Sequence, residues 1–226
     1  MSFNVAFKKI FAPFRLKVIR KYNQASDINV LDVGCGNDSC AISKKWLPIK
    51  QYHGLDKEFW HGNEDDYRTM DKVFYIDLQN ELEKLMELPN DYYDVIILSH
   101  VIEHIKNGEE AISKLVKKLK VGGLIYVETP HARTLGYPSA LGFFNFNDES
   151  THVMIYSYYD VARTMLQNDL HVIKAKTRRD WVRIIFFSPV AILLNLIYYI
   201  PLKQKLYVTG LWDLFGVAFY AIARKK

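Results

Sequence analysis

The stretch "VLDVGCGN" at residues 30–37 decides the fold of this chain. It begins as a short apolar run, which is typical of a buried strand, and it ends in a turn that contains two glycines. Helical spacing follows in "DSCAISKKWL" (38–47), where Asp38 is a candidate capping residue and Pro48 ends the helix. The sequence therefore predicts a strand that enters a helix through a glycine turn.

The same alternation of strand and helix continues downstream. The clearest strand is "YYDVIILSH", which is rich in β-branched residues. Strands that alternate with helices at this spacing predict an α/β, Rossmann-like, doubly wound sheet of about seven strands. The expected strands are 28–34, 51–56, 72–78, 92–100, 122–130, 171–177 and 215–226, with further helices at 109–120 and 157–170.

The composition limits the class of protein. Hydrophobic residues make up 50% and charged residues 24% of the 226 residues, as in a globular protein with a real core. The net charge of +5 fits an acidic ligand, a phosphate-rich partner or an anionic membrane surface, and equally a solvated basic face. Because the basic excess is small and scattered, we expect no nucleic-acid partner.

The two cysteines and the N-terminal segment indicate the cellular compartment of the protein. Cys35 and Cys40 can build neither a disulfide framework nor a four-ligand zinc site, which favours a reducing, cytoplasmic compartment. Residues 1–24 lack the apolar centre and cleavage site of a secretory signal, so an amphipathic first helix explains them better.

Chemistry-bearing residues follow four of the expected strands. The glycine turn at 34–36 follows the first strand, and Asp56 ends the second, twenty residues after Gly36. Asp77-Leu78 and Ser99-His100 end the third and fourth. Ligands of open parallel sheets bind beyond the carboxyl ends of the strands, where glycines allow close approach and a carboxylate can accept ribose hydroxyls. These residues therefore predict one cleft.

With these residues in place, the chain resembles the class I S-adenosylmethionine-dependent methyltransferases. The resemblance implies that the last strand is antiparallel and inserts between the two strands before it. It also implies that Gly34 and Gly36 approach the amino-acid end of the cofactor, that Asp56 holds the ribose and that Asp77 and Leu78 hold the adenine. Ser99 or His100 would lie near the methionine portion, and Asp32, Cys35 and Lys57 complete the expected cofactor site. The segments that carry the resemblance are "VLDVGCGN", "GLDKE" (54–58), "YIDLQ" (75–79), "YYDVIILSHVIEHI" (92–105) and "LKVGGLIYVETPH" (119–131).

The glycine turn departs from two known patterns. The resembled family often has a third glycine where this chain has Asp38. A nicotinamide-dependent dehydrogenase, the main rival within the fold, needs glycine where Ser39 stands. We therefore favour the methyltransferase, with the dehydrogenase as the weaker alternative.

The pattern His100-x-x-Glu103-His104 matches a zinc-hydrolase signature as a bare string. That class needs both histidines on one helix, whereas His100 directly follows a predicted strand. Two interpretations stay open. The pair Glu103-His104 either shapes the cleft wall or, as the resemblance to ubiquinone-pathway and small-RNA methyltransferases implies, binds a divalent metal together with His100 and His152. His100, His104 and His152 are also the candidate catalytic residues, with His131 as a further candidate base.

The apolar segment 184–201 approaches the length of a membrane span. The strand that follows must return to the sheet, so a single crossing is excluded. A dip into a membrane surface, an apolar cap and a homodimer face stay open. The basic residues expected to flank a headgroup layer are Arg178, Arg179, Arg183, Lys203 and Lys205.

We expect one methyltransferase domain that acts on a small-molecule, glycan or lipid-linked acceptor, with an oxygen as the methylated atom. The acceptor side would be formed by 131–156 and 178–212. The alternative is a catalytically inactive cofactor-binding module whose apolar tail is a membrane or partner interface. The expected parts are an N-terminal helical arm (1–27), a cofactor-binding core (28–177), an apolar cap or membrane-facing insertion (178–212) and a final strand (213–226).

Overall fold

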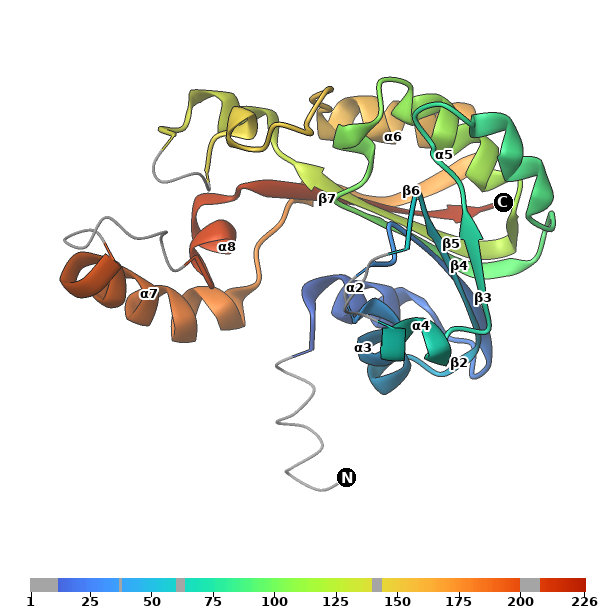
Figure 1. The fold of residues 1–226 in the computed structure, drawn as a ribbon, viewed down its shortest axis with the longest axis horizontal. Coiled ribbons are helices and arrows are strands. Elements are labelled where there is room, and N and C mark those ends of the chain that lie inside the picture. Colours follow the sequence, from blue (N-terminus) through green and yellow to red (C-terminus); the bar gives the residue numbers. More distant parts are fainter. Residues whose placement is uncertain (1–11, 37, 60–63, 140–143, 200–207) are drawn as a thin grey trace.

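The computed structural model describes residues 12–36, 38–59, 64–139, 144–199 and 208–226, and within them the chain forms one seven-stranded sheet (Figure 1). The strand order is β3-β2-β1-β4-β5-β7-β6. The first five strands are parallel, and β7 lies between β5 and β6 and is antiparallel to both. The predicted doubly wound sheet with an antiparallel last strand is confirmed. The strands are β1 (Ile28–Val33), β2 (Ile49–Asp56), β3 (Lys72–Tyr75), β4 (Tyr93–Ser99), β5 (Leu119–Pro130), β6 (Leu170–Thr177) and β7 (Ala218–Lys225).

Helices cover both faces of the sheet (Figure 1). On one face, α2 (Phe14–Tyr22), α3 (Ser39–Trp46) and α4 (Glu64–Thr69) pack against a core that includes Ile19, Cys40 and Tyr67. On the other, α5 (Gly108–Val116) and α6 (Tyr158–Gln167) pack against a second core that includes Leu115 and Met165. Because the sheet is buried on both faces, its central strands are continuous apolar runs.

Local sequence explains why individual elements form. In β4, Val95 to Leu98 are fully buried, and the strand pairs with both β1 and β5. Helix α6 begins with a capping box, in which the Ser157 hydroxyl accepts the Asp160 amide at 3.2 Å and donates to its carboxylate at 2.7 Å.

Several expected boundaries are wrong, and β3, for example, ends at Tyr75 and not at residue 78. Residues 119 and 120 open β5 and do not continue the helix, because Leu119 pairs with Tyr93 ahead of a bulge. The final strand begins at Ala218, because residues 211–215 form helix α8 (Leu211–Phe215), which Gly216 ends in a left-handed conformation. Within the expected N-terminal arm, residues 1–27, helix α2 ends at Tyr22, and residues 1–11 lie outside the described part.

The apolar segment forms a helical arm, residues 181–199, that projects from the sheet (Figure 1). It comprises the π-helix η5 (Arg183–Phe187), α7 (Ser188–Leu194) and the π-helix η6 (Asn195–Tyr199). Among the described helices, none combines the length and the apolar character that a membrane crossing needs. The chain leaves the sheet at the end of β6 and returns to it in β7. The short helices η1 (Leu82–Glu87), η2 (Ile102–His104), η3 (Ala132–Gly136) and η4 (Phe146–Asp148) complete the described elements.

Candidate functional site

The loop after β1 is shaped for close approach. Gly34 has a φ of 72°, and a Cβ placed there would lie 2.6 Å from Val101 Cγ2. The Gly36 amide donates to Asp56 Oδ2 at 3.2 Å, and Asp56 Oδ1 accepts the Lys57 amide at 2.8 Å. These bonds join the loops that follow β1 and β2. Asp38 adopts a left-handed φ of 58°, which explains why glycine suits this position in the resembled family.

Two of the residues expected at the cofactor site support it from inside the core. Asp32 is buried, and its Oδ2 accepts the Tyr52 hydroxyl at 2.5 Å and the Ser39 hydroxyl. Burial raises the pKa of Asp32. Cys35 is fully buried, and its sulfur lies 2.5 Å from where a side chain on Gly54 would begin. Both cysteines are free. The side chains of Asp32 and Cys35 therefore brace the loop from below.

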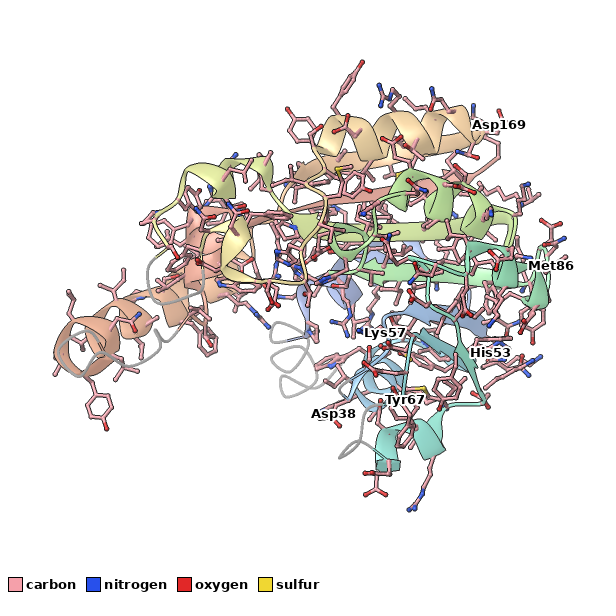
Figure 2. All side chains as sticks on the ribbon, turned by 45° about the horizontal axis from the view of Figure 1, so that its top comes forward. Asp38, His53, Lys57, Tyr67, Met86 and Asp169 are labelled. Carbon is pink, nitrogen blue, oxygen red and sulfur yellow. The ribbon has the colours of Figure 1, made fainter. Side chains whose placement is uncertain are left out.

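The other expected cofactor residues lie at the carboxyl edge of the sheet. Asp77 follows β3, and its carboxylate accepts the Gln79 amide at 2.9 Å and the Asn80 side chain at 2.7 Å. Leu78 is buried in the core, whereas Lys57 is exposed (Figure 2) and lies 3.5 Å from Glu58. In strand order, the edge reads Asp77, Asp56, the Gly34–Gly36 loop and Ser99-His100. The structure thus brings the predicted strand-end residues into one row.

His100 sits between two carboxylates. It follows the last residue of β4, has a left-handed φ of 58° and places Nδ1 3.0 Å from Glu103 Oε1. Its Nε2 lies 3.4 Å from Glu128 Oε1. Burial lowers the pKa of His100, but the two carboxylates outweigh burial and raise it to about 9. At neutral pH the ring is therefore protonated, which disfavours the role of general base.

A series of side chains with alternating charge continues from His100. Glu128, near the end of β5, accepts Arg178 Nη1 at 2.8 Å and the Tyr126 hydroxyl. Arg178 also places Nε 3.0 Å from Asp213 Oδ1. Burial raises the pKa of Glu128, but Arg178 and His100 outweigh burial and lower it overall. Arg178 is therefore part of the site, and the expectation that it flanks a headgroup layer is wrong.

A cavity of about 310 Å³ opens beside this series of charged side chains. Four buried side-chain nitrogens at its wall have no hydrogen-bond partner among the described residues. His100 Nε2 and Arg178 Nε still lie within 3.4 Å of a carboxylate oxygen, and the other two are Arg15 Nε and Trp212 Nε1. The rings of Trp212 and His100 lie 5.9 Å apart. Unpaired buried donors are costly, so the cavity suits a ligand rich in oxygen acceptors. Its other lining residues include Phe14, Ser99, Glu128, Arg178, Arg183 and Asp213.

Glu103, His104 and His152 form a second cluster next to His100. One ligand atom from each lies within 4.8 Å of the others. His104 Nδ1 lies 3.1 Å from the Thr151 carbonyl oxygen and His152 Nδ1 lies 2.8 Å from that of Phe146. A carbonyl can only accept, so each neutral ring carries its proton on Nδ1 and leaves Nε2 with a lone pair.

This arrangement fits a divalent cation. Metal-binding histidines typically donate their other nitrogen to a carbonyl, as both rings do here. Two imidazoles and one carboxylate suit zinc, iron or manganese better than magnesium. Glu103 Oε2 also accepts the Thr129 hydroxyl at 2.8 Å, which orients the carboxylate.

Of the four candidate metal ligands, the structure brings Glu103, His104 and His152 together, and His100 is outside the group. His100 and His104 do not share a helix, because β4 ends at Ser99 and η2 begins at Ile102. His131 belongs to neither cluster: its Nδ1 accepts the Arg133 amide at 3.1 Å.

Sequence reasoning missed Trp212, Asp213 and the roles of Arg15, Glu128 and Arg178. Glu128 carries a recoverable signal, because it is a carboxylate within the buried run "LIYVETP". The residues from α2 and α8 carry no such signal, since they reach the cavity only through packing of segments distant in sequence.

Comparisons with known proteins agree with this geometry. A family model described as a methyltransferase domain matches residues 9–175. A protein of Rickettsia bellii named ubiquinone biosynthesis O-methyltransferase is 31% identical over 144 residues, which cover 60% of this chain and 58% of the relative. A mitochondrial protein of that name from Dictyostelium discoideum is 28% identical over 155 residues, covering 57% and 48%. The match thus spans about half to three fifths of these relatives.

Solved structures share the fold at low sequence identity. A methyltransferase from Archaeoglobus fulgidus, described as dependent on S-adenosylmethionine (SAM), has a TM-score of 0.56 and 20% identity, covering 99% of this chain and 100% of that one. Phosphoethanolamine N-methyltransferase 2 of Haemonchus contortus, in complex with S-adenosyl-L-methionine, has a TM-score of 0.63 and 12% identity, covering 93% and 52%.

Proposed function

The chain belongs to the methyltransferase domain family, and from this premise we propose that it is a class I S-adenosylmethionine-dependent enzyme that methylates a hydroxyl oxygen of a small acceptor bound beside His100. The observation that carries the proposal is the cavity at the end of β4, which Ser99, His100 and Trp212 line together. The O-methyltransferase names of the curated relatives support oxygen as the methylated atom.

The row of residues at the carboxyl edge would hold the cofactor. Gly34 and Gly36 leave room for its amino-acid end, Asp56 would accept the ribose hydroxyls and Asp77 would lie near the adenine. When bound, S-adenosylmethionine supplies a methyl group that is already activated on a sulfonium. The chain therefore has to align the acceptor and exclude water, and alignment accounts for much of the acceleration.

His100 would act as a hydrogen-bond donor. Its Nδ1 is paired with Glu103, whereas its Nε2 has no hydrogen-bond partner among the described residues, and the His100 side chain lines the cavity together with Trp212. The unpaired N–H groups of Arg15 and Trp212 favour an acceptor that carries several oxygens, such as a hydroxylated ring, a sugar or the polar head of a lipid-linked molecule.

Glu103, His104 and His152 would hold a divalent metal. Such an ion would lower the pKa of a hydroxyl that binds to it. The ring nitrogens that face away from the backbone carbonyls are the available ligands, and Glu103 links this cluster to His100.

Cofactor binding is tested by calorimetry with S-adenosylmethionine on the wild type and on Asp56→Asn. We expect the substitution to weaken binding roughly tenfold to hundredfold, because charge-assisted hydrogen bonds to the ribose are lost. Asp65→Asn is the matched control, since this carboxylate is exposed and pairs with Arg68. If the wild type did not bind the cofactor, the proposal would fail.

Metal binding is tested independently of activity, by elemental analysis and by the absorption spectrum of added cobalt. We expect the wild type to bind one divalent ion, and His104→Ala and His152→Ala to lose it. His171→Ala, at an exposed position on β6, should bind as the wild type does. Methyl transfer from labelled cofactor to hydroxylated aromatic and sugar acceptors then tests the reaction. Transfer to nitrogen in place of oxygen would contradict the assigned acceptor atom.

A further inference from the structure

The helical arm, residues 181–199, has an inverted distribution of polar and apolar residues. Its buried positions are small or polar: Ser188, Ala191 and Asn195 have exposed fractions of 2%, 0% and 5%. Its large apolar side chains face outward. The exposed ones are Trp181, Ile185, Phe186, Val190, Ile192, Leu193, Leu194, Leu196, Ile197 and Tyr198. A helix that faces water shows the opposite arrangement.

The exposed apolar surface extends around much of the helix. Ile192, Leu193 and Leu194 are consecutive in α7, and each is exposed by 39% or more. Successive residues of an α-helix are offset by about 100°, so these three alone cover about 200° of the circumference. A second copy of the chain would cover one face of such a helix, whereas a lipid phase can cover all of its exposed part.

The root of the arm is fixed to the domain. Arg179 donates to the carbonyl oxygens of Asp213 and Leu214, and the Asp180 amide donates to Asp213 Oδ1 at 3.0 Å. A side chain on Gly210 would clash with the arm, because its Cβ would lie 2.7 Å from the Arg183 carbonyl oxygen. The exposed apolar residues are therefore presented by a packed element.

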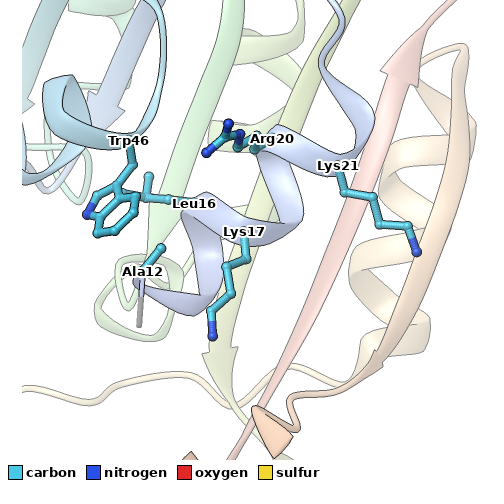
Figure 3. A pocket seen from close by; sticks show the side chains of 6 residues that line it. All are labelled: Ala12, Leu16, Lys17, Arg20, Lys21 and Trp46. Atoms are coloured by element: carbon cyan, nitrogen blue, oxygen red, sulfur yellow. The ribbon is translucent and has the colours of Figure 1, made fainter. Parts of the chain in front are cut away.

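Lys17 adjoins this root, and further basic residues lie about one turn along α2. Lys17 on α2 pairs with Asp180 at 2.7 Å, directly before the arm begins. Arg20 and Lys21, on the same helix, are exposed, and α2 contains no acidic residue. Figure 3 shows these three side chains spread along α2 around a surface hollow of about 370 Å³ that Leu16 and Trp46 also line. The arm itself contains Arg183 and no acidic residue.

We propose that the arm lies in the surface of an anionic lipid bilayer. Its outer side chains enter the boundary between headgroups and acyl chains, and the cations of α2 approach the phosphate groups. The arm cannot cross the bilayer once and end there, since the chain returns to pair β7 with β5 and β6. The proposal is independent of the acceptor and of the metal.

Co-sedimentation with lipid vesicles tests the proposal. We expect the full chain to bind vesicles of phosphatidylglycerol and phosphatidylcholine more tightly than vesicles of phosphatidylcholine alone, and added salt to weaken this binding. Leu193→Asp and Ile197→Asp should each lower vesicle affinity about tenfold or more, because an exposed apolar side chain that would enter the lipid is replaced by a charge. Met86→Asp is the matched control, because Met86 is 80% exposed and lies at the opposite end of the molecule (Figure 2).

Two further measurements separate lipid from other occupants. Brominated lipid should quench the fluorescence of the wild type more than that of Trp181→Phe, since Trp181 is 66% exposed on the arm. Sedimentation velocity would reveal a second copy. A dimer that Ile197→Asp dissociates, or vesicle binding that the arm variants leave unchanged, would overturn the proposal. Binding of S-adenosylmethionine should be the same in all variants, which distinguishes failure here from failure of the proposed function.

Discussion

At the scale of single residues, protonation of His100 makes the stability of the protein depend on pH. The carboxylates of Glu103 and Glu128 outweigh burial and raise the pKa of His100 from an ordinary value near 6.5 to about 9. Stabilisation from this proton is fully present below the unfolded pKa and is lost as pH rises through the folded one. We therefore expect the free energy of unfolding to fall between about pH 6.5 and pH 9.

The measurement is urea unfolding across this pH range, together with an NMR titration of the imidazole. His100→Gln should remove much of the pH dependence, whereas His171→Gln, at an exposed position, should leave it unchanged. A His100 titration midpoint near 6.5 would contradict the assignment.

Substitution of Gly34 tests the loop that we propose to face the cofactor. Gly34→Ala should destabilise the protein by about 1–3 kcal/mol, because alanine is strained at a φ of 72° and its Cβ would lie 2.6 Å from Val101. Gly136→Ala is the control, since its Cβ meets nothing within 4 Å. In the double variant Gly34→Ala with Val101→Ala the steric clash is removed, so part of the lost stability should be recovered. The cost of the strained backbone at residue 34 should remain. Thermal unfolding of the set checks this, and equal stability of both single variants would refute it.

Asp38 shows the limit of sequence patterns at this scale. Asp38 stands at the start of α3 as predicted, but its side chain makes no capping hydrogen bond to the helix, and its backbone is left-handed. Asp32 and Cys35 show the same limit, because their side chains face the core and only their neighbours line the edge.

At the scale of elements, Arg178 links the ends of β5 and β6 to α8. Arg178→Met should cost about 3–5 kcal/mol of unfolding free energy, because it leaves Glu128 charged and buried without its partner. Arg163→Met should cost about 1 kcal/mol or less, since Arg163 pairs with Glu109 at the surface.

Urea unfolding of both variants measures the difference. The double variant Arg178→Met with Glu128→Gln should be more stable than Arg178→Met alone, because the buried charge is removed. If Arg178→Met and Arg163→Met had the same free energy of unfolding, the ion pair between Arg178 and Glu128 would not contribute to stability.

The parallel part of the sheet was predictable because its strands are apolar runs that end in a glycine turn, a polar residue or proline. The helices α7 and α8 were not, since composition alone cannot distinguish a membrane dip, a cap and a dimer face. Periodicity also placed the start of β5 too late, because Leu119 and Lys120 continue the helical pattern and pair in the sheet through a bulge. Strand pairing in the folded protein, and not the helical periodicity, therefore determines where β5 begins.

At the scale of the whole molecule, the arm and the sheet pack against different clusters of buried hydrophobic residues. The arm packs on a small cluster of buried residues, Phe144, Ala191, Leu211 and Val217, whereas β4 lies between the two large cores. We expect amide hydrogens of Val95 to Leu98 to exchange only through global unfolding, and those of α7 to exchange faster through local opening. Hydrogen exchange with mass spectrometry checks this, and equal protection of both segments would refute it.

The place of β7 in the sheet has a consequence for synthesis on the ribosome. In the described sheet β6 is an edge strand whose neighbour is β7, and β7 follows the arm in sequence. Translation therefore delivers the apolar arm before the strand that docks β6 onto the rest of the sheet. During that interval the nascent polypeptide exposes an unpaired strand and a lipophilic helix at once. We therefore expect binding of a chaperone or of a nearby membrane surface to favour folding until the last strand arrives.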